Sequence, residues 1–197
     1  MALLDDVKMD TWTNFLFLRH GQTDWNLEGR FQGVADIPLN ATGIDQAAGA
    51  ATILARQPID RIVSSPLIRA LKTAAIVSER ISIPIDIDTQ LIERGFGKLE
   101  GLVVNDVKRD IGISLDVPMA RHLPPDAEQW PDTVARTQAA IDTWLARCPG
   151  ETLLFVAHHG LFAALSELLT GHRKEGENGV PYEFQRSGAV WTITKVK

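Results

Sequence analysis

Hydrophobic residues follow two different periods along the chain. Runs of consecutive apolar residues are typical of strands buried on both faces. They occur at 14–18, 59–63, 83–87, 152–157 and 189–196. Elsewhere apolar residues recur every three or four positions, as on one face of a helix. These amphipathic segments begin near 42, 65, 131 and 159. The alternation predicts an α/β fold, a three-layer α/β/α sandwich with a mostly parallel sheet covered by helices on both faces.

Two of the predicted helices have recognisable starts. Thr42 is followed three residues later by Asp45, which resembles a capping box. Ser65 precedes Pro66, a residue favoured in the first helical position. We therefore predict helices capped by Thr42 and by Ser65. The apolar face expected for the first of these helices consists of Ile44, Ala47, Ala48, Ala51 and Leu54.

The 197 residues contain no linker-like stretch, internal repeat or low-complexity tract. We predict a single domain over 1–197, with a short N-terminal extension at 1–13. The periodicity weakens from 101 to 125, where we expect irregular structure and one helix near 105–111. The segment 101–131 is interpreted as a small cap or insert.

Composition excludes several classes of function. The net charge of -5 argues against a protein that binds nucleic acid or an anionic membrane surface, because such proteins usually have a basic face. No apolar run is long enough to span a bilayer. Acidic residues occupy the N-terminal positions where a signal peptide needs positive charge, and a lone Cys148 suits a reducing compartment. We expect a cytoplasmic protein with no nucleic-acid or membrane partner. Its oligomeric state is left open.

Basic side chains follow three of the predicted strands. Arg19 and His20 end the first strand, Arg69 lies shortly after the second, and His158 ends the strand at 152–157. Ligands of open α/β sheets bind beyond the carboxyl ends of the strands. The sequence therefore predicts that these four residues meet at one edge of the sheet.

Such a cluster suits a phosphoryl group. The planar guanidinium of arginine matches phosphate oxygens, and two buried guanidinium groups without an anion would each cost on the order of several kcal/mol. We therefore expect phosphate or another anion in the resting site. A histidine among these cations should have a lowered pKa, which keeps a ring nitrogen free to act as a nucleophile.

Five segments, in the same order, resemble those of the histidine phosphatase superfamily, in its phosphoglycerate-mutase-like branch. They are LRHGQTDWN (18–26), GRFQGVADIPLNATG (29–43), SSPLIRALKTA (64–74), LIERGFGKLEG (91–101) and FVAHHG (155–160). The resemblance covers nearly the whole chain and implies the phosphoglycerate mutase-like α/β/α fold.

The resemblance also implies roles for individual residues. His20 would be the nucleophile that becomes phosphorylated. Glu93 would be the acid that protonates the leaving oxygen. Arg19, Arg69 and His158 would bind the phosphoryl oxygens. The substrate-binding positions would be Thr23, Asn26, Arg30, Gln32, Gly33 and His159. No cofactor is implied, and no metal is expected, because no third ligand accompanies the pair His158–His159.

The length and the cations of the cap distinguish phosphatase from mutase activity within this family. The mutases resembled carry a long insertion with a lysine and an Arg-Arg pair, whereas the stretch between Gly101 and Thr152 has no such pair. Its single cations Lys108, Arg109 and Arg121 could still reach the pocket. A mutase must exclude water from its intermediate, whereas a phosphatase must admit it. The short cap therefore favours hydrolysis.

The sequence predicts a phosphomonoester hydrolase that acts on a small phosphorylated substrate through a phosphohistidine. A cofactor-dependent phosphoglycerate mutase is the alternative, and a non-catalytic phospho-ligand-binding protein is a second one. Substrate specificity should reside in 101–131 and 172–187.

Overall fold

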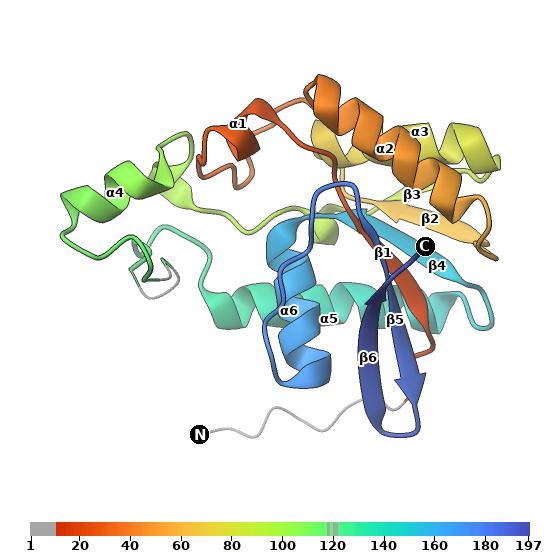
Figure 1. The fold of residues 1–197 in the computed structure, drawn as a ribbon. Coiled ribbons are helices and arrows are strands. Elements are labelled where there is room, and N and C mark those ends of the chain that lie inside the picture. The colour runs from red at the N-terminus through yellow and green to blue at the C-terminus, as the bar shows by residue number, and fades with distance from the viewer. Residues whose placement is uncertain (1–10, 118, 120–121) are drawn as a thin grey trace.

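A six-stranded sheet lies between two layers of helices in the computed structural model, which describes residues 11–117, 119 and 122–197 (Figure 1). The strand order is β3-β2-β4-β1-β5-β6. The strands are β1 (Phe15–Arg19), β2 (Arg61–Ser64), β3 (Ile85–Ile87), β4 (Leu153–Ala157), β5 (Pro181–Ser187) and β6 (Val190–Lys195). The predicted α/β class with a central sheet is confirmed.

Helices cover both faces of the sheet. In Figure 1, α2 (Ala41–Leu54) and α3 (Ile68–Ile81) cover one face, and α5 (Trp130–Arg147) and α6 (His159–Thr170) cover the other. Two short helices, α1 (Asp24–Leu27) and α4 (Val104–Asp110), lie beyond the carboxyl end of β1. The 3-10 helices η2 (Thr89–Leu91) and η3 (Gly97–Leu99) lie between β3 and α4 along the chain.

The sheet is parallel from β3 to β1 and antiparallel beyond it. β1 pairs in parallel with β4, β4 with β2, and β2 with β3. On its other side β1 pairs with β5, which runs antiparallel and continues into the β6 hairpin. β5 was not predicted from the sequence, because 181–187 begins with proline and is mostly polar. Its buried Tyr182 and Phe184 do alternate with Glu183 and Gln185, as expected of a strand.

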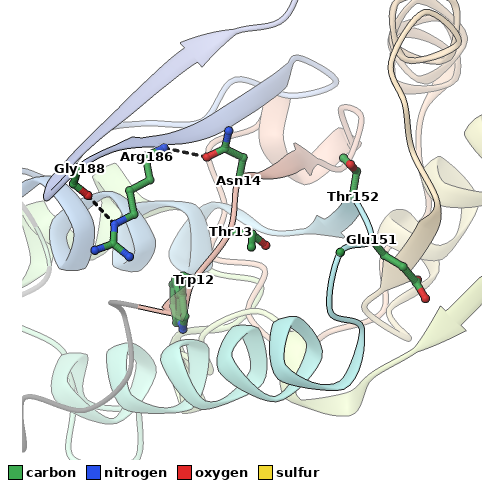
Figure 2. A pocket seen from close by; sticks show the side chains of 8 residues that line it. Trp12, Thr13, Asn14, Glu151, Thr152, Arg186 and Gly188 are labelled. Carbon is green, nitrogen blue, oxygen red and sulfur yellow. Dashed lines mark hydrogen bonds between the residues drawn. The ribbon is translucent and has the colours of Figure 1, made fainter.

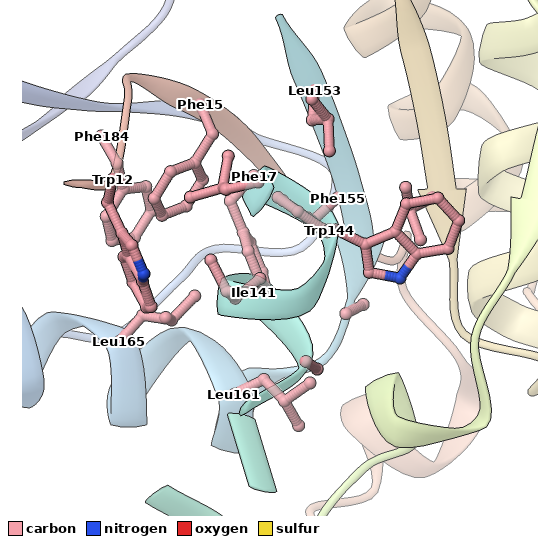
Figure 3. Packing of buried hydrophobic residues seen from close by; sticks show 14 of the residues in the cluster. Trp12, Phe15, Phe17, Ile141, Trp144, Leu153, Phe155, Leu161, Leu165 and Phe184 are labelled. Carbon is pink, nitrogen blue, oxygen red and sulfur yellow. The ribbon is translucent and has the colours of Figure 1, made fainter. Parts of the chain in front are cut away.

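Alternate side chains of β1 build two separate cores. Phe15 and Phe17 pack with α5 and α6, where Phe15 stacks on Phe184 with ring centroids 4.7 Å apart (Figure 3). Leu16 and Leu18 face α2 and α3 on the other side. This alternation follows from the pleat of the strand. It holds the carboxyl end of β1 between two packed layers.

Both capped helices start at residues other than those predicted. α2 begins at Ala41, because the side chain of Asn40 accepts the hydrogen bond of the Gly43 N–H at 2.9 Å. α3 begins at Ile68, after Leu67, so Ser65 does not cap it and Pro66 precedes it. The buried face of α2 is accordingly shifted. Ile44 and Ala48 are exposed, and the buried residues are Gly43, Ala47, Ala50, Ala51 and Leu54.

The predicted extension and insert are only partly described. Residues 1–10 lie outside the described part, but Trp12 of the extension is buried in the core and donates from Nε1 to Asp142 Oδ1 at 3.2 Å. In the insert, α4 agrees with the helix expected near 105–111. It packs in a small core with Phe31, Leu99 and Met119. The division of 1–197 into one domain with a cap remains a prediction.

Two glycines let the loop after β1 rest on the start of α2. A Cβ on Gly21 would lie 2.2 Å from the Gly43 carbonyl oxygen, and a Cβ on Gly43 would lie 2.1 Å from the Gln22 carbonyl oxygen. Both distances are too short for any side chain. The residue directly after His20 therefore has to be glycine if the loop is to pack in this way.

We expect Gly43→Ala to lower the free energy of unfolding by about 1–3 kcal/mol, because the backbone must shift to admit the methyl group. Gly49→Ala on the same helix is the matched control, since a Cβ there meets nothing within 4 Å. It should raise stability by about 0.4–1 kcal/mol. Denaturant unfolding measures both changes. Equal effects of the two substitutions would contradict the close contact.

Candidate active site

A cavity of about 220 Å³ lies at the carboxyl ends of the parallel strands. It is lined by Arg19, His20, Asn26, Arg30, Phe31, Gln32, Gly33, Arg69, Glu93, Phe96, Val104 and His159. Four of the five predicted catalytic residues therefore line one space. The fifth, His158, adjoins it, because its ring centroid lies 5.2 Å from that of His20.

The ring of His20 is fixed by the main chain. Its backbone N–H donates to the Ala157 carbonyl at 3.0 Å, which extends the pairing of β1 with β4 by one residue. Its ring Nδ1 lies 2.7 Å from the Gly21 carbonyl oxygen. A carbonyl oxygen can only accept, so Nδ1 carries the hydrogen and Nε2 has the free lone pair.

The surroundings keep this ring neutral. Burial lowers the pKa of His20 well below its ordinary value, and the positive charges of Arg19 and Arg69 lower it further. Burial is thus a larger cause of the lowered pKa than the cations from which the sequence predicted it. A neutral ring with Nε2 unprotonated is the form required of a nucleophile.

Carbonyl oxygens orient the two arginines of the cavity. Arg19 donates from Nη1 to the Gly176 carbonyl at 2.8 Å. Arg69 is fully buried and donates to the carbonyls of Ala35 and Gly33 at 2.7 and 2.8 Å. Burial lowers the pKa of both groups, whereas the charge of Glu93 raises it. Within the described residues neither guanidinium forms a salt bridge, and the Nε of each is buried without a hydrogen-bond partner.

Glu93 is held at the first turn of α6. Its Oε1 accepts hydrogen bonds from the N–H groups of Gly160 at 3.0 Å and of Arg94 at 2.8 Å. A Cβ on Gly160 would lie 2.5 Å from this oxygen, so the position after His158–His159 needs a glycine. The carboxyl group is thereby fixed in the cavity that His20 lines.

His158 is positioned by Ser65. The ring Nε2 lies 2.8 Å from Ser65 Oγ, which also accepts from the Leu67 N–H at 3.3 Å. The serine hydroxyl can donate to Nε2 or accept from it, and in either case it fixes the orientation of the ring. The ring Nδ1 is buried without a partner among the described residues. Burial lowers the pKa of His158 well below its ordinary value, and Arg69 and His20 lower it further.

The predicted substrate-binding residues differ in their positions. Asn26, Arg30, Gln32, Gly33 and His159 line the cavity. Thr23 is fully buried and does not line it, because it caps α1 in a capping box with Asn26. Its Oγ1 also lies 3.0 Å from Gln32 Oε1, so Thr23 contacts the cavity residues and not the cavity itself.

Gly33 allows the substrate loop to approach the segment after η3. It has a φ of +53°, and a Cβ there would lie 2.0 Å from Glu100 Oε1. Arg30 reaches the same segment by donating from Nη1 to the Gly101 carbonyl at 2.8 Å. The loop that carries these residues is therefore fixed against the start of the cap.

Sequence reasoning missed three residues that support the site. Ser65 was interpreted as a helix cap. The carbonyl of Gly176 and the side chain of Asn178, whose Nδ2 donates to the His20 carbonyl at 2.9 Å, lie in a stretch without periodicity. The one available signal was the Asn and Gly content of 176–179, which is typical of a tight loop.

Lys108 and Arg109, two cations of the cap, do not enter the cavity. Lys108 donates from Nζ to the Leu115 carbonyl at 2.5 Å, and Arg109 pairs with Asp106 at 3.0 Å. Neither lines the cavity. Arg121 lies outside the described residues. The expectation that Lys108 and Arg109 could reach the site is therefore wrong.

Another cavity, of about 500 Å³, lies at the amino-terminal ends of β1 and β4, between Trp12, Asn14, Glu151 and Arg186 (Figure 2). There the Arg186 N–H donates to Asn14 Oδ1 at 2.9 Å. Glu151 is already paired with Arg61 at 2.8 Å. None of the described residues that line this cavity is a histidine or cysteine. The groups suited to phosphoryl transfer are therefore at the opposite edge of the sheet.

The described residues contain neither a cluster of metal-ligating side chains nor a helix that could span a membrane. Within 11–117, 119 and 122–197, no three His, Cys, Asp or Glu side chains cluster as a metal site would require. In the same residues no helix has the length and apolar character needed to cross a bilayer.

Several known proteins similar to this chain are phosphatases. A model of the histidine phosphatase superfamily (branch 1) matches residues 15–183. An uncharacterized phosphatase, PhoE of Bacillus subtilis, is 33% identical over 160 residues, which cover 81% of this chain and 78% of that protein. A glucosyl-3-phosphoglycerate phosphatase of Mycobacterium tuberculosis is 37% identical over 168 residues, which cover 78% of this chain and 74% of that protein.

A solved structure agrees with these matches. The complex of a mycobacterial glucosyl-3-phosphoglycerate phosphatase with inorganic phosphate superposes with a TM-score of 0.75 at 28% identity. The match covers 93% of this chain and 96% of that one.

We expect the rings of His20 and His158 to stay neutral at about pH 6, below the ordinary histidine pKa. In the unfolded chain the same rings take up protons near pH 6.5. Acidification below that value therefore favours unfolding, and stability should fall as the pH drops toward the lowered pKa of the folded state. Ring nitrogen chemical shifts measured by NMR across this range test the prediction. Protonation of both rings at their ordinary pKa would contradict it.

Proposed function

The chain belongs to the histidine phosphatase superfamily, and we propose that it is a phosphomonoester hydrolase that works through phosphorylation of His20. The observation that carries the proposal is one free ring nitrogen, Nε2 of His20, in a cavity that two arginines with unused donors also line. Those donors are Nε of Arg19 and Nε of Arg69, and like Nδ1 of the adjoining His158 they are buried without a partner in the described part of the chain. A phosphoryl group is the ligand that would use all of them.

In the first step, the Nε2 lone pair attacks phosphorus and the bond to the leaving oxygen breaks. The negative charge on the phosphoryl oxygens is stabilised by the preoriented guanidinium groups of Arg19 and Arg69, which need little reorganisation. The leaving oxygen takes a proton from the Glu93 carboxyl group, so the alcohol departs neutral. Phosphohistidine and the free alcohol are the products of this step.

In the second step, a water oxygen attacks the same phosphorus. Glu93, now a carboxylate, accepts a proton from this water while the bond between phosphorus and Nε2 breaks. Inorganic phosphate is released and His20 returns to its neutral form. The protons balance over the two steps, because Glu93 gives one proton and regains one.

The cap supports hydrolysis over phosphoryl return. Lys108 and Arg109 are engaged by the Leu115 carbonyl and by Asp106, so they cannot anchor an intermediate in the cavity. Water can then replace the departed alcohol, as a phosphatase requires.

The proposal also covers the substrate, the ligand of the resting site, the need for a cofactor and the location of the protein. We propose that the substrate is small and phosphorylated, and that phosphate or another anion occupies the resting site. We propose that catalysis needs neither a cofactor nor a metal, because the arginines supply the positive charge. The single, buried and unpaired Cys148 supports a cytoplasmic location.

Incubation with a labelled phosphomonoester should leave an acid-labile label on the wild type and none on His20→Ala. Phosphate release should persist in the presence of a chelator. An unlabelled but correctly folded wild type would favour a non-catalytic binding protein. Label accompanied by isomerised phosphoglycerate would instead indicate a mutase.

Glu93→Gln should lower kcat about 10²–10⁴-fold for alkyl phosphates, whose alkoxide leaving group needs a proton. The loss should be much smaller for p-nitrophenyl phosphate, which has a leaving group that departs as an anion. Steady-state rates on the two substrates give the comparison. A uniform loss on both would indicate that Glu93 positions other groups and does not donate the proton.

A further inference from the structure

Three side chains outside the cavity fix the two peptide groups that follow His20. The first group joins His20 to Gly21, and the second joins Gly21 to Gln22. In each group both the N–H and the carbonyl oxygen are hydrogen-bonded, either to another part of the chain or to the His20 ring. The three side chains are those of Gln46, Thr73 and Asn178, and none of them lines the cavity.

Thr73 of α3 binds the first peptide group. Its Oγ1 accepts the hydrogen bond of the Gly21 N–H at 3.1 Å and donates its single hydrogen to the Arg69 carbonyl at 2.8 Å. The bond to the carbonyl four residues earlier is common for a helical threonine, whereas the bond to Gly21 joins α3 to the loop after β1. Both residues are buried, so the Gly21 N–H would be costly to leave unpaired.

Asn178 binds the other end of the same peptide group. Its Nδ2 donates to the His20 carbonyl at 2.9 Å and to Asn26 Oδ1 at 3.3 Å, which fixes the orientation of the amide. The N–H of the next residue, Gly179, donates to the Arg19 carbonyl at 3.0 Å. The first peptide group is therefore held from α3 on one side and from the loop before β5 on the other.

Gln46 of α2 binds the second peptide group. Its Oε1 accepts the hydrogen bond of the Gln22 N–H at 2.8 Å, while the Gly21 carbonyl of the same group lies 2.7 Å from the ring Nδ1 of His20. The Gln46 side chain is itself held, since a Cβ on Gly179 would lie only 2.5 Å from the Gln46 Cβ. Gln46 thus sets the direction of the oxygen that binds the ring.

We propose that Gln46, Thr73 and Asn178 are positioning residues that keep the free lone pair of His20 on Nε2. The hydrogen bond made by one ring nitrogen decides which nitrogen of a neutral histidine carries the proton. For His20 that bond goes to a main-chain oxygen, so the tautomer depends on the orientation of the two peptide groups. The inference rests on the phosphatase function proposed above, in which Nε2 attacks phosphorus.

Ring nitrogen chemical shifts of His20 test the proposal without substrate. At about pH 8, above the ordinary histidine pKa, the wild type should have a protonated Nδ1 and an unprotonated Nε2. Thr73→Val keeps the shape of the side chain but removes the acceptor of the Gly21 N–H, so a second form with the proton on Nε2 should appear. Thr73→Ser keeps the hydroxyl and should restore the wild-type spectrum. A tautomer unchanged in folded Thr73→Val would overturn the inference.

The rate of His20 phosphorylation provides the functional measurement. Thr73→Val should lower the rate about 10-fold, as expected for one lost hydrogen bond, and leave substrate affinity nearly unchanged. Thr73→Ser should regain most of the rate. Rapid-quench experiments with p-nitrophenyl phosphate give these rates.

Thr137→Val is the matched control. Thr137 is a buried threonine of α5, and within the described residues its hydroxyl bonds only the Thr133 carbonyl, at 2.7 Å. The substitution removes the same hydroxyl from the same kind of position and should leave the phosphorylation rate unchanged. Equal losses in Thr73→Val and Thr137→Val would contradict a specific effect on His20.

Asn178→Ala and Gln46→Leu provide a second test if Thr73→Val does not fold, since both residues are only half-buried. Each should produce the Nε2-protonated form and lower the phosphorylation rate about 2- to 10-fold. A wild-type tautomer and rate in both folded variants would overturn the inference and leave the hydrolase intact. A wild type that forms no phosphohistidine would instead reject the hydrolase, and the ring shifts would still show whether these side chains set the tautomer.

Discussion

The structure is organised around two arginines, Arg69 fully buried and Arg19 half-buried, that form no salt bridge with any described carboxylate. Arg69 is fully buried and held by two carbonyl oxygens, and Arg19 is held by one. Buried guanidinium groups are costly unless an anion compensates them. Glu93 supplies negative charge to both, but its oxygens are bound to the N–H groups of Gly160 and Arg94. The positive charge that remains around His20 is what suits the cavity to a phosphoryl group.

The packing of the sheet fixes the positions of the residues around His20. β1 and β4 are paired as far as Arg19 and Ala157, the residues directly before His20 and His158. The two histidines therefore follow the ends of neighbouring strands. The glycine contacts at Gly21 and Gly160 then leave no room for the loops to shift. Preoriented groups of this kind lower the barrier of phosphoryl transfer without reorganisation during the reaction. The same rigidity fixes Nδ1 of His20 against a carbonyl and leaves Nε2 free.

The sequence predicted the parts of the site that lie at the ends of strands. Arg19, His20 and His158 follow apolar runs, and parallel strands necessarily bring their ends to one edge. It did not predict the groups that orient them, because Ser65, Gly176 and Asn178 come from loops whose positions depend on tertiary contacts. β5 was missed for the same reason, since its pairing with β1 and β6 supports a mostly polar segment. The start of α2 was misplaced because Asn40 and Thr42 are both good capping residues and only the fold selects Asn40.

The chemistry of His20 can be tested at the level of a single atom. Phosphohistidine formed by rapid mixing with a phosphomonoester can be quenched in base, digested and analysed by phosphorus NMR, which distinguishes the two ring isomers. The account predicts that the phosphate is on Nε2 of the ring in the peptide that contains His20. Phosphate on Nδ1 of that ring, or on the peptide that contains His158 and His159, would contradict it.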